Sequence, residues 1–120
     1  MICQDIFVYL LTKYDSEARV SSKITDVVKT KRLYFDGGSG TIFQKLGLKP
    51  GEKCEEWNLT KPETVINLHK EYLMAGADII KTNTFGANAL KFDNITLEEI
   101  IKSAVHNAKK AIEECALKEE

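Results

Sequence analysis

Two short apolar segments, each followed by a helical pattern, constrain the fold of this chain more than any other feature. The segments span residues 32–35 and about 78–82, and the helical patterns follow at about 61–75 and 96–118. The order strand, helix, strand, helix predicts parallel strands joined by right-handed crossovers. The sequence therefore predicts an α/β fold.

Both predicted helices begin with a capping signal. The sequence TKPE at 60–63 makes Thr60 a candidate N-cap, and TLEE at 96–99 does the same for Thr96. In a capping box the hydroxyl and the acid three residues later each accept a hydrogen bond from a free backbone N–H. These signals predict where the two helices start.

The other segments carry weaker patterns. Residues 2–14 predict a short helix, and the polar residues 15–22 predict a loop. One or two turns of helix are predicted over 41–46, ended by Gly47. Residues 47–59 contain Pro, Gly and several acids, which predicts a surface loop.

Composition excludes several functional classes. Seventeen basic and eighteen acidic residues give a net charge of -1, so the chain has no electrostatic footprint for nucleic acid or a membrane surface. The apolar run at residues 6–11 is too short to span a bilayer, and it follows Asp5 rather than a basic region. Three cysteines without a CxxC pair (Cys3, Cys54 and Cys115) predict a reducing, cytoplasmic setting.

Polar residues follow each predicted strand, at the place where α/β folds form ligand sites. Residues 36–38 follow the first strand, and residues 83–85 follow the second. Both groups would face one site, because the carboxyl ends of parallel strands meet at the same edge. An isolated DGGSG stretch is more often a tight turn, and it fits neither GxGxxG nor GKS/T. From the residues alone, the turn and the binding site both stay open.

The segments YFDGGSGTIFQKLG and NLTKPETVINLHKEYLMAGADIIKTNTFGAN closely resemble the homocysteine S-methyltransferase family, in particular the homocysteine-binding domain of methionine synthase. The resemblance covers roughly residues 23–118, and TNTFGAN resembles the cobalamin-dependent methionine synthases more than the betaine-dependent enzymes of the family. It implies the first two βα units of a truncated (β/α)8 TIM barrel over residues 23–120. Residues 1–22 stay unassigned, as an extra N-terminal helical segment.

The resemblance also implies an activity. Family members transfer a methyl group to the thiolate of homocysteine, and methionine synthases make methionine in this way. In the complete domain three cysteine thiolates hold a zinc ion, which binds the homocysteine sulfur as a thiolate. In the family the methyl group comes from a corrinoid cofactor, cobalamin in the methionine synthases of that type, or from another activated donor.

The family motifs assign substrate-binding residues by position. An aspartate and two glycines would hold the amino-acid part of homocysteine, and the second strand-end motif would line the same pocket. In this chain these residues are Asp36, Gly37, Gly38, Thr82, Asn83, Thr84 and Phe85. Asn58 is a further candidate, because the family often carries asparagine there. A carboxylate facing an ammonium group suits an amino-acid ligand.

The zinc ligands of the family have no counterpart here. Those cysteines lie late in the barrel, and none of the three in this chain occupies their positions, so no metal site is predicted. Cys115 fits a small core residue. His69 is predicted to pack beside Tyr72, and His106 to face solvent. Glu55 and Trp57 are predicted to belong to a solvated loop that the tryptophan anchors.

Two functional hypotheses follow. In the first, the chain is the N-terminal part of a methyltransferase, with the remaining barrel and the methyl-donor domains as partners. About a quarter of a barrel is expected to be inactive alone, to self-associate or to bind homocysteine only weakly. In the second, it is a truncated or split-gene module without catalytic activity that binds a partner fragment or a small amino acid.

Overall fold

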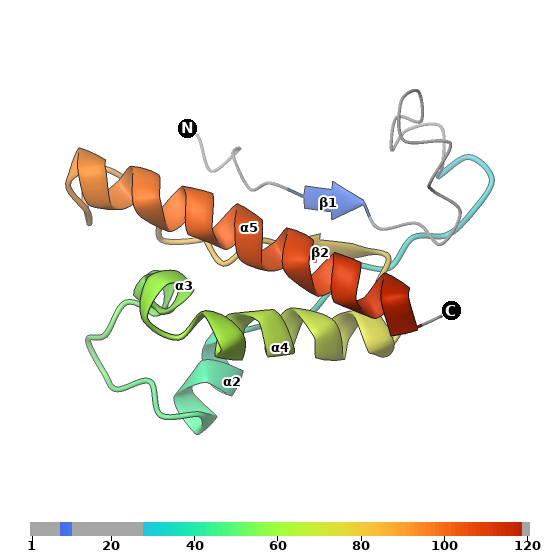
Figure 1. Ribbon diagram of the computed structural model, residues 1–120, viewed down its shortest axis with the longest axis horizontal. Helices are drawn as coiled ribbons and strands as arrows, with labels where there is room; N and C mark the ends of the chain where they lie inside the picture. The colour runs from blue at the N-terminus through green and yellow to red at the C-terminus, as the bar shows by residue number, and fades with distance from the viewer. Residues whose placement is uncertain (1–7, 11–27, 119–120) are drawn as a thin grey trace.

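The computed structural model describes residues 8–10 and 28–118 of the chain. Two short strands and a set of helices make up this part (Figure 1). In chain order the elements are β1 (Val8–Leu10), α2 (Gly40–Lys45), the 3-10 helix η3 (Cys54–Glu56), α3 (Trp57–Thr60), α4 (Pro62–Met74), β2 (Ile79–Lys81) and α5 (Asn94–Lys118). Among the described helices, none combines the length and the apolar character that crossing a bilayer requires.

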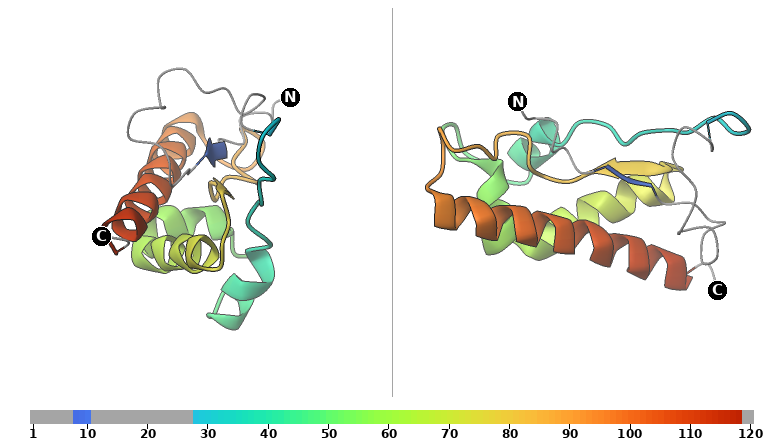
Figure 2. Two further views of the ribbon diagram at one scale, coloured as in Figure 1. Left: turned by 90° about the vertical axis from the view of Figure 1, so that its right-hand side faces the viewer. Right: turned by 90° about the horizontal axis from the view of Figure 1, so that it is seen from above.

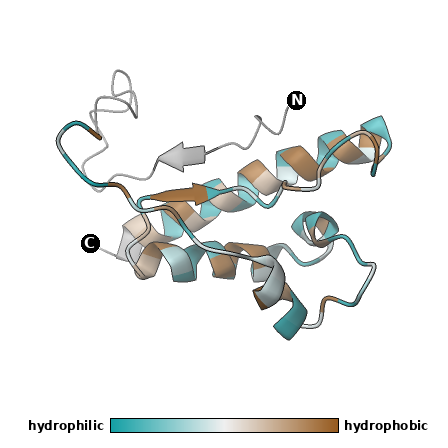
Figure 3. Ribbon diagram, turned by 180° about the vertical axis from the view of Figure 1, so that it is seen from behind, coloured by the Kyte–Doolittle hydropathy of each residue, from teal (hydrophilic) through white to brown (hydrophobic). Residues whose placement is uncertain are grey.

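Helices α4 and α5 lie side by side on one side of β2 and run in the same direction (Figures 1 and 2). Their contact is apolar: Ile66 and Leu73 of α4 pack with Ile80 of β2 and with Ala108 and Ile112 of α5. In Figure 3, β2 is hydrophobic and both helices alternate hydrophobic with hydrophilic residues. Burial of these apolar stripes is the main force that holds the two helices against the strand.

A second apolar cluster attaches α2 and α3 to α4. It contains Phe43, Trp57, Val65 and Leu68, and the ring centroids of Phe43 and Trp57 are 5.3 Å apart. The surface loop predicted for residues 47–59 is therefore wrong for its second half, which forms η3 and α3. Burial of the Trp57 side chain, which is only 5% exposed, stabilises this turn despite the acids around it.

Residues 34–36 run parallel to β2. The amide of Asp36 donates to the carbonyl of Ile79 at 2.9 Å, and the amide of Asp78 donates to the carbonyl of Tyr34 at 2.8 Å. Phe35 and Ile79 form a parallel bridge, but residues 32–35 do not form a regular strand. The polar residues that follow these two parallel stretches, 36–38 and 83–85, therefore lie at the same end of the pair.

The helix predicted for residues 2–14 is wrong where the structure describes it. Residues 8–10 form β1, which pairs antiparallel with β2 in the register Val8↔Lys81 and Leu10↔Ile79. A strand edge offers unpaired backbone groups, and Val and Tyr are residue types that favour strands. The rest of that segment, the predicted loop at 15–22 and Cys3 lie outside the described residues.

Helix α2 forms where a short helix was predicted, and it is followed by Gly47 with a positive φ of 111°. The predicted cap of α4 is wrong. Lys61 occupies the N-cap position, while Thr60 is the last residue of α3 and donates from Oγ1 to the carbonyl of Glu56 at 3.2 Å. Because α3 continues through Thr60, its hydroxyl cannot cap the next helix.

The predicted cap of α5 is also wrong, by three residues. Asp93 precedes the helix, and its Oδ1 accepts a hydrogen bond from the Thr96 amide at 2.9 Å. Its Oδ2 accepts a second one from the Thr96 hydroxyl at 2.8 Å. A carboxylate is the stronger acceptor for the free amides at a helix start, so Thr96 lies inside the first turn.

Candidate functional site

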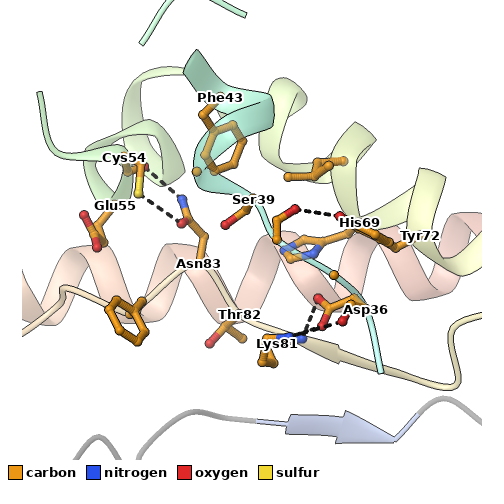
Figure 4. A pocket seen from close by; sticks show the side chains of 15 residues that line it. Asp36, Ser39, Phe43, Cys54, Glu55, His69, Tyr72, Lys81, Thr82 and Asn83 are labelled. Atoms are coloured by element: carbon orange, nitrogen blue, oxygen red, sulfur yellow. Dashed lines mark hydrogen bonds and ion pairs between the residues drawn. The ribbon is translucent and has the colours of Figure 1, made fainter. Parts of the chain in front are cut away.

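A cleft of about 440 Å³ opens where residues 34–36 and β2 end (Figure 4). Its walls come from the glycine-containing loop at 36–40, from α4, from the start of η3 and from the segment after β2. The parallel alignment of the two strand segments therefore brings residues that are far apart in the sequence to one site.

Asp36 is fixed between the two strand ends. Its Oδ2 accepts from the Lys81 amide at 3.0 Å, and its Oδ1 accepts from Lys81 Nζ at 2.6 Å. The Asp36 side chain is only 6% exposed. The carboxylate expected to hold a substrate ammonium group thus has a lysine ammonium beside it already.

The two glycines after Asp36 differ in what surrounds them. A Cβ atom on Gly37 would lie 2.8 Å from the Tyr72 hydroxyl oxygen, whereas one on Gly38 would meet no atom of the described residues within 4 Å. Tyr72 donates its hydroxyl hydrogen to the carbonyl of Gly38 at 2.6 Å. Gly37 therefore allows α4 to approach the loop closely, and Tyr72 holds the loop in place.

The second strand-end motif is only partly in the cleft. Thr82, Asn83 and Phe85 line it, and Thr84 does not, although its hydroxyl lies 2.9 Å from that of Thr82. Thr82 and Asn83 are buried, while the Phe85 side chain is 92% exposed. The structure therefore brings six of the seven predicted substrate-binding residues to the cleft.

Asn58 supports the cleft from outside. Its Nδ2 donates to the carbonyls of Asn83 at 2.8 Å and of Glu55 at 2.9 Å, and the residue is 1% exposed. Asn58 is not among the residues that line the cleft. It ties α3 to the strand-end segment, so its role in the described structure is to position Asn83.

Glu55 was predicted to be solvated, and this is wrong. The residue is 6% exposed, and its Oε1 accepts from the Gly86 amide at 2.6 Å. A loop amide that would otherwise be unpaired explains why a carboxylate is buried here. Glu55 and Asn58 are three residues apart, which places them on the same face of a helical turn. This spacing is the feature of the sequence that could have predicted their burial.

The geometry agrees with a family comparison. The family model described as homocysteine S-methyltransferase matches residues 33–118, more than half of the chain. The chain belongs to the homocysteine S-methyltransferase family. The match covers both strand-end segments of the cleft. No solved structure matches the chain.

His69 is a wall residue of the cleft that the family motifs did not assign. It lies on α4 three residues before Tyr72 and is 4% exposed. Burial lowers the pKa of the imidazole to about 4, against a smaller opposing effect of the Asp36 charge. The imidazole is therefore neutral near pH 7, and its Nε2 has no hydrogen-bond partner among the described residues. His106 is exposed, as predicted.

The described residues do not fit the zinc site of the homocysteine S-methyltransferases. No group of three His, Cys, Asp or Glu residues among them could hold a metal ion. Cys54 lines the cleft, but burial and the neighbouring Glu55 raise the pKa of its thiol to about 11. It stays protonated near neutral pH, and Cys115 belongs to the core as predicted.

Proposed function

We propose that this chain forms the amino-acid-binding part of a homocysteine S-methyltransferase of the methionine synthase type. Such an enzyme transfers a methyl group to the homocysteine thiolate and produces methionine. The observation that carries the proposal is the position of Asp36. Its carboxylate lies at the carboxyl ends of two parallel segments, within a cleft that is lined by residues from both family motifs.

The described side chains suit the non-reacting part of homocysteine. Two oxygens of Asp36 are held in place by Lys81, and the carboxylate retains lone pairs for a substrate ammonium group. Phe43 and Leu68 supply apolar wall for the methylene groups. Neutral His69, whose Nε2 has no partner in the part of the chain that the structure describes, offers one further polar contact inside the cleft.

Activation of the homocysteine sulfur belongs to another part of the enzyme in this proposal. When bound, zinc would coordinate the homocysteine sulfur and stabilise it as a thiolate, which is the form that attacks a methyl group. Because the described residues lack a suitable ligand set, we assign the zinc ligands and the cobalamin-binding region to further barrel strands and donor domains. The chain alone would then be inactive, and its expected setting is the cytoplasm, where methionine is made.

A second candidate is a module without catalytic activity that binds a partner fragment or a small amino acid. The exposed apolar side chains favour it: Tyr34 and Phe35 are each 56% exposed, and Leu90 is 98% exposed. The two candidates differ in what a partner adds. Barrel strands from a partner would complete a zinc site and give methyl transfer, whereas a binding module would gain affinity without activity.

The test is a titration of the ¹⁵N-labelled chain with L-homocysteine, followed by NMR, which detects weak binding. Asp36→Asn should weaken binding by about 10- to 100-fold, because a hydrogen bond between charged groups contributes about 1.5–3 kcal/mol. Glu114→Gln is the control, since Glu114 also pairs with a lysine, Lys70, but outside the cleft. Equal affinity of Asp36→Asn and the unchanged chain, with both folded, would contradict the proposal.

A further inference from the structure

The ion pair between Asp36 and Lys81 is unevenly exposed. Lys81 Nζ lies 2.6 Å from Asp36 Oδ1, yet the lysine side chain is 40% exposed and the aspartate side chain only 6%. Figure 4 shows both side chains at one edge of the cleft, joined by dashed lines. Both residues line the cleft, and the lysine is the more exposed of the two.

Both members of the pair keep unused hydrogen-bonding capacity. A lysine ammonium has three N–H donors, and Lys81 Nζ contacts Asp36 Oδ1 at 2.6 Å and, more weakly, the Asp36 carbonyl at 3.4 Å. The Asp36 carboxylate has about four lone-pair sites, of which Lys81 occupies two. Each group can take one more partner without giving up its present one.

Lys81 is also the only positively charged residue among the described residues that line the cleft. Its charged neighbours there are Asp36 and Glu55, and Glu55 already accepts from the Gly86 amide. A ligand carboxylate in this cleft therefore has one cationic side chain available to it.

The strand fixes the direction of Lys81. Ile80 packs against α4 and α5, and neighbouring residues of a strand point to opposite faces. Lys81 accordingly points away from the helices, and its amide hydrogen bond to Asp36 holds the backbone in place. This side chain is anchored in the site and is not a freely moving surface lysine.

We propose that Lys81 binds the α-carboxylate of the amino-acid substrate while Asp36 binds its α-ammonium group. The Asp36–Lys81 ion pair then recognises a zwitterionic ligand, because the ammonium group of the ligand contacts Asp36 and its carboxylate contacts Lys81. A ligand with only the ammonium group would leave the Lys81 charge uncompensated. This inference rests on the proposed function, and it makes Lys81 the residue that selects α-amino acids over simple aminothiols.

The test compares L-homocysteine with 3-aminopropanethiol, which keeps the amine and the thiol but lacks the carboxylate. The unchanged chain should bind homocysteine about 10- to 100-fold more tightly, the range for one charged hydrogen bond. Lys81→Met should remove most of this preference, and Lys81→Arg should keep it. Lys70→Met is the matched control, since it breaks a lysine–carboxylate pair away from the cleft.

The outcomes separate this inference from the proposed function. Homocysteine binding that depends on Asp36 but shows no preference over 3-aminopropanethiol overturns the role of Lys81 and leaves the proposed function intact. A preference that survives in folded Lys81→Met overturns it too. If the unchanged chain binds no homocysteine, both proposals fall. Lys81→Gln, which keeps a neutral donor beside Asp36, replaces Lys81→Met if that variant does not fold.

Discussion

His69 links the cleft to the stability of the whole chain. Its side chain is almost completely buried on α4, and Nε2 has no partner in the described structure. Burial disfavours the imidazolium form, which places the pKa at about 4 instead of the ordinary 6.5. The folded chain therefore resists the protonation that the unfolded chain accepts.

The consequence is a loss of stability in mild acid. Between pH 6.5 and about 4 the unfolded chain binds more protons at His69, so the stabilisation present above pH 6.5 is lost as the pH falls. The full effect is roughly 3 kcal/mol from the shift in pKa. Urea unfolding at pH 7 and pH 5 should show a steeper loss for the unchanged chain than for His69→Gln. The exposed His106→Gln should behave like the unchanged chain, and equal pH slopes for all three would contradict this account.

The sequence predicted the cleft residues that belong to local motifs. Asp36, Gly37, Gly38, Thr82, Asn83 and Phe85 line the cleft, and their role in substrate binding stays a prediction. The sequence did not predict His69, Tyr72 and Lys81 there, because their place in the cleft depends on how α4 and β2 pack against the glycine loop. An apolar stripe on a helix shows which residues are buried, but not whether they face a core or a ligand.

The start of α5 is set by a single acidic residue. Asp93 accepts from both the amide and the hydroxyl of Thr96, and its pKa is lowered mainly by these hydrogen bonds. The long helix that follows carries the core residues that pack on α4 and β2. A weaker cap would therefore affect more than the first turn.

Asp93→Ala should lower the free energy of unfolding by about 1 kcal/mol, the usual effect of losing an N-cap. Thr60→Ala should cost less than about 0.5 kcal/mol, because Thr60 is exposed at the end of α3 and caps no helix. Urea denaturation of both variants measures the difference. A larger decrease in the free energy of unfolding for Thr60→Ala than for Asp93→Ala would indicate that Thr60 does cap α4, as the TKPE sequence predicted.

The sequence predicted α4 and α5 to within two residues at each end, because their apolar spacing is long and regular. Their caps were wrong, since several polar residues compete near each helix start and packing decides among them. Helix α3 was missed because its few residues carry no periodicity, and the burial of Trp57 that stabilises it is a tertiary contact.

The described part of the molecule has a layered arrangement, with α4 and α5 on one side of β2 and the cleft at the strand end. The order of elements predicted this placement, since parallel segments joined by a helix leave their carboxyl ends at one edge. The (β/α)8 barrel stays a proposal that rests on the family. A second cleft, of about 490 Å³, lies between the helices and contains Pro62, Ser103 and His106.

Because the described residues form a second cleft away from the strand ends, the position of the bound ligand decides whether the strand-end cleft is the homocysteine site. The measurement is an isotope-filtered NOESY spectrum of the labelled chain with unlabelled L-homocysteine. The account predicts contacts from the homocysteine side chain to His69, Tyr72 and Thr82, which line the strand-end cleft. Contacts to Pro62, Ser103 and His106 instead, or none at all at saturating homocysteine, would contradict it.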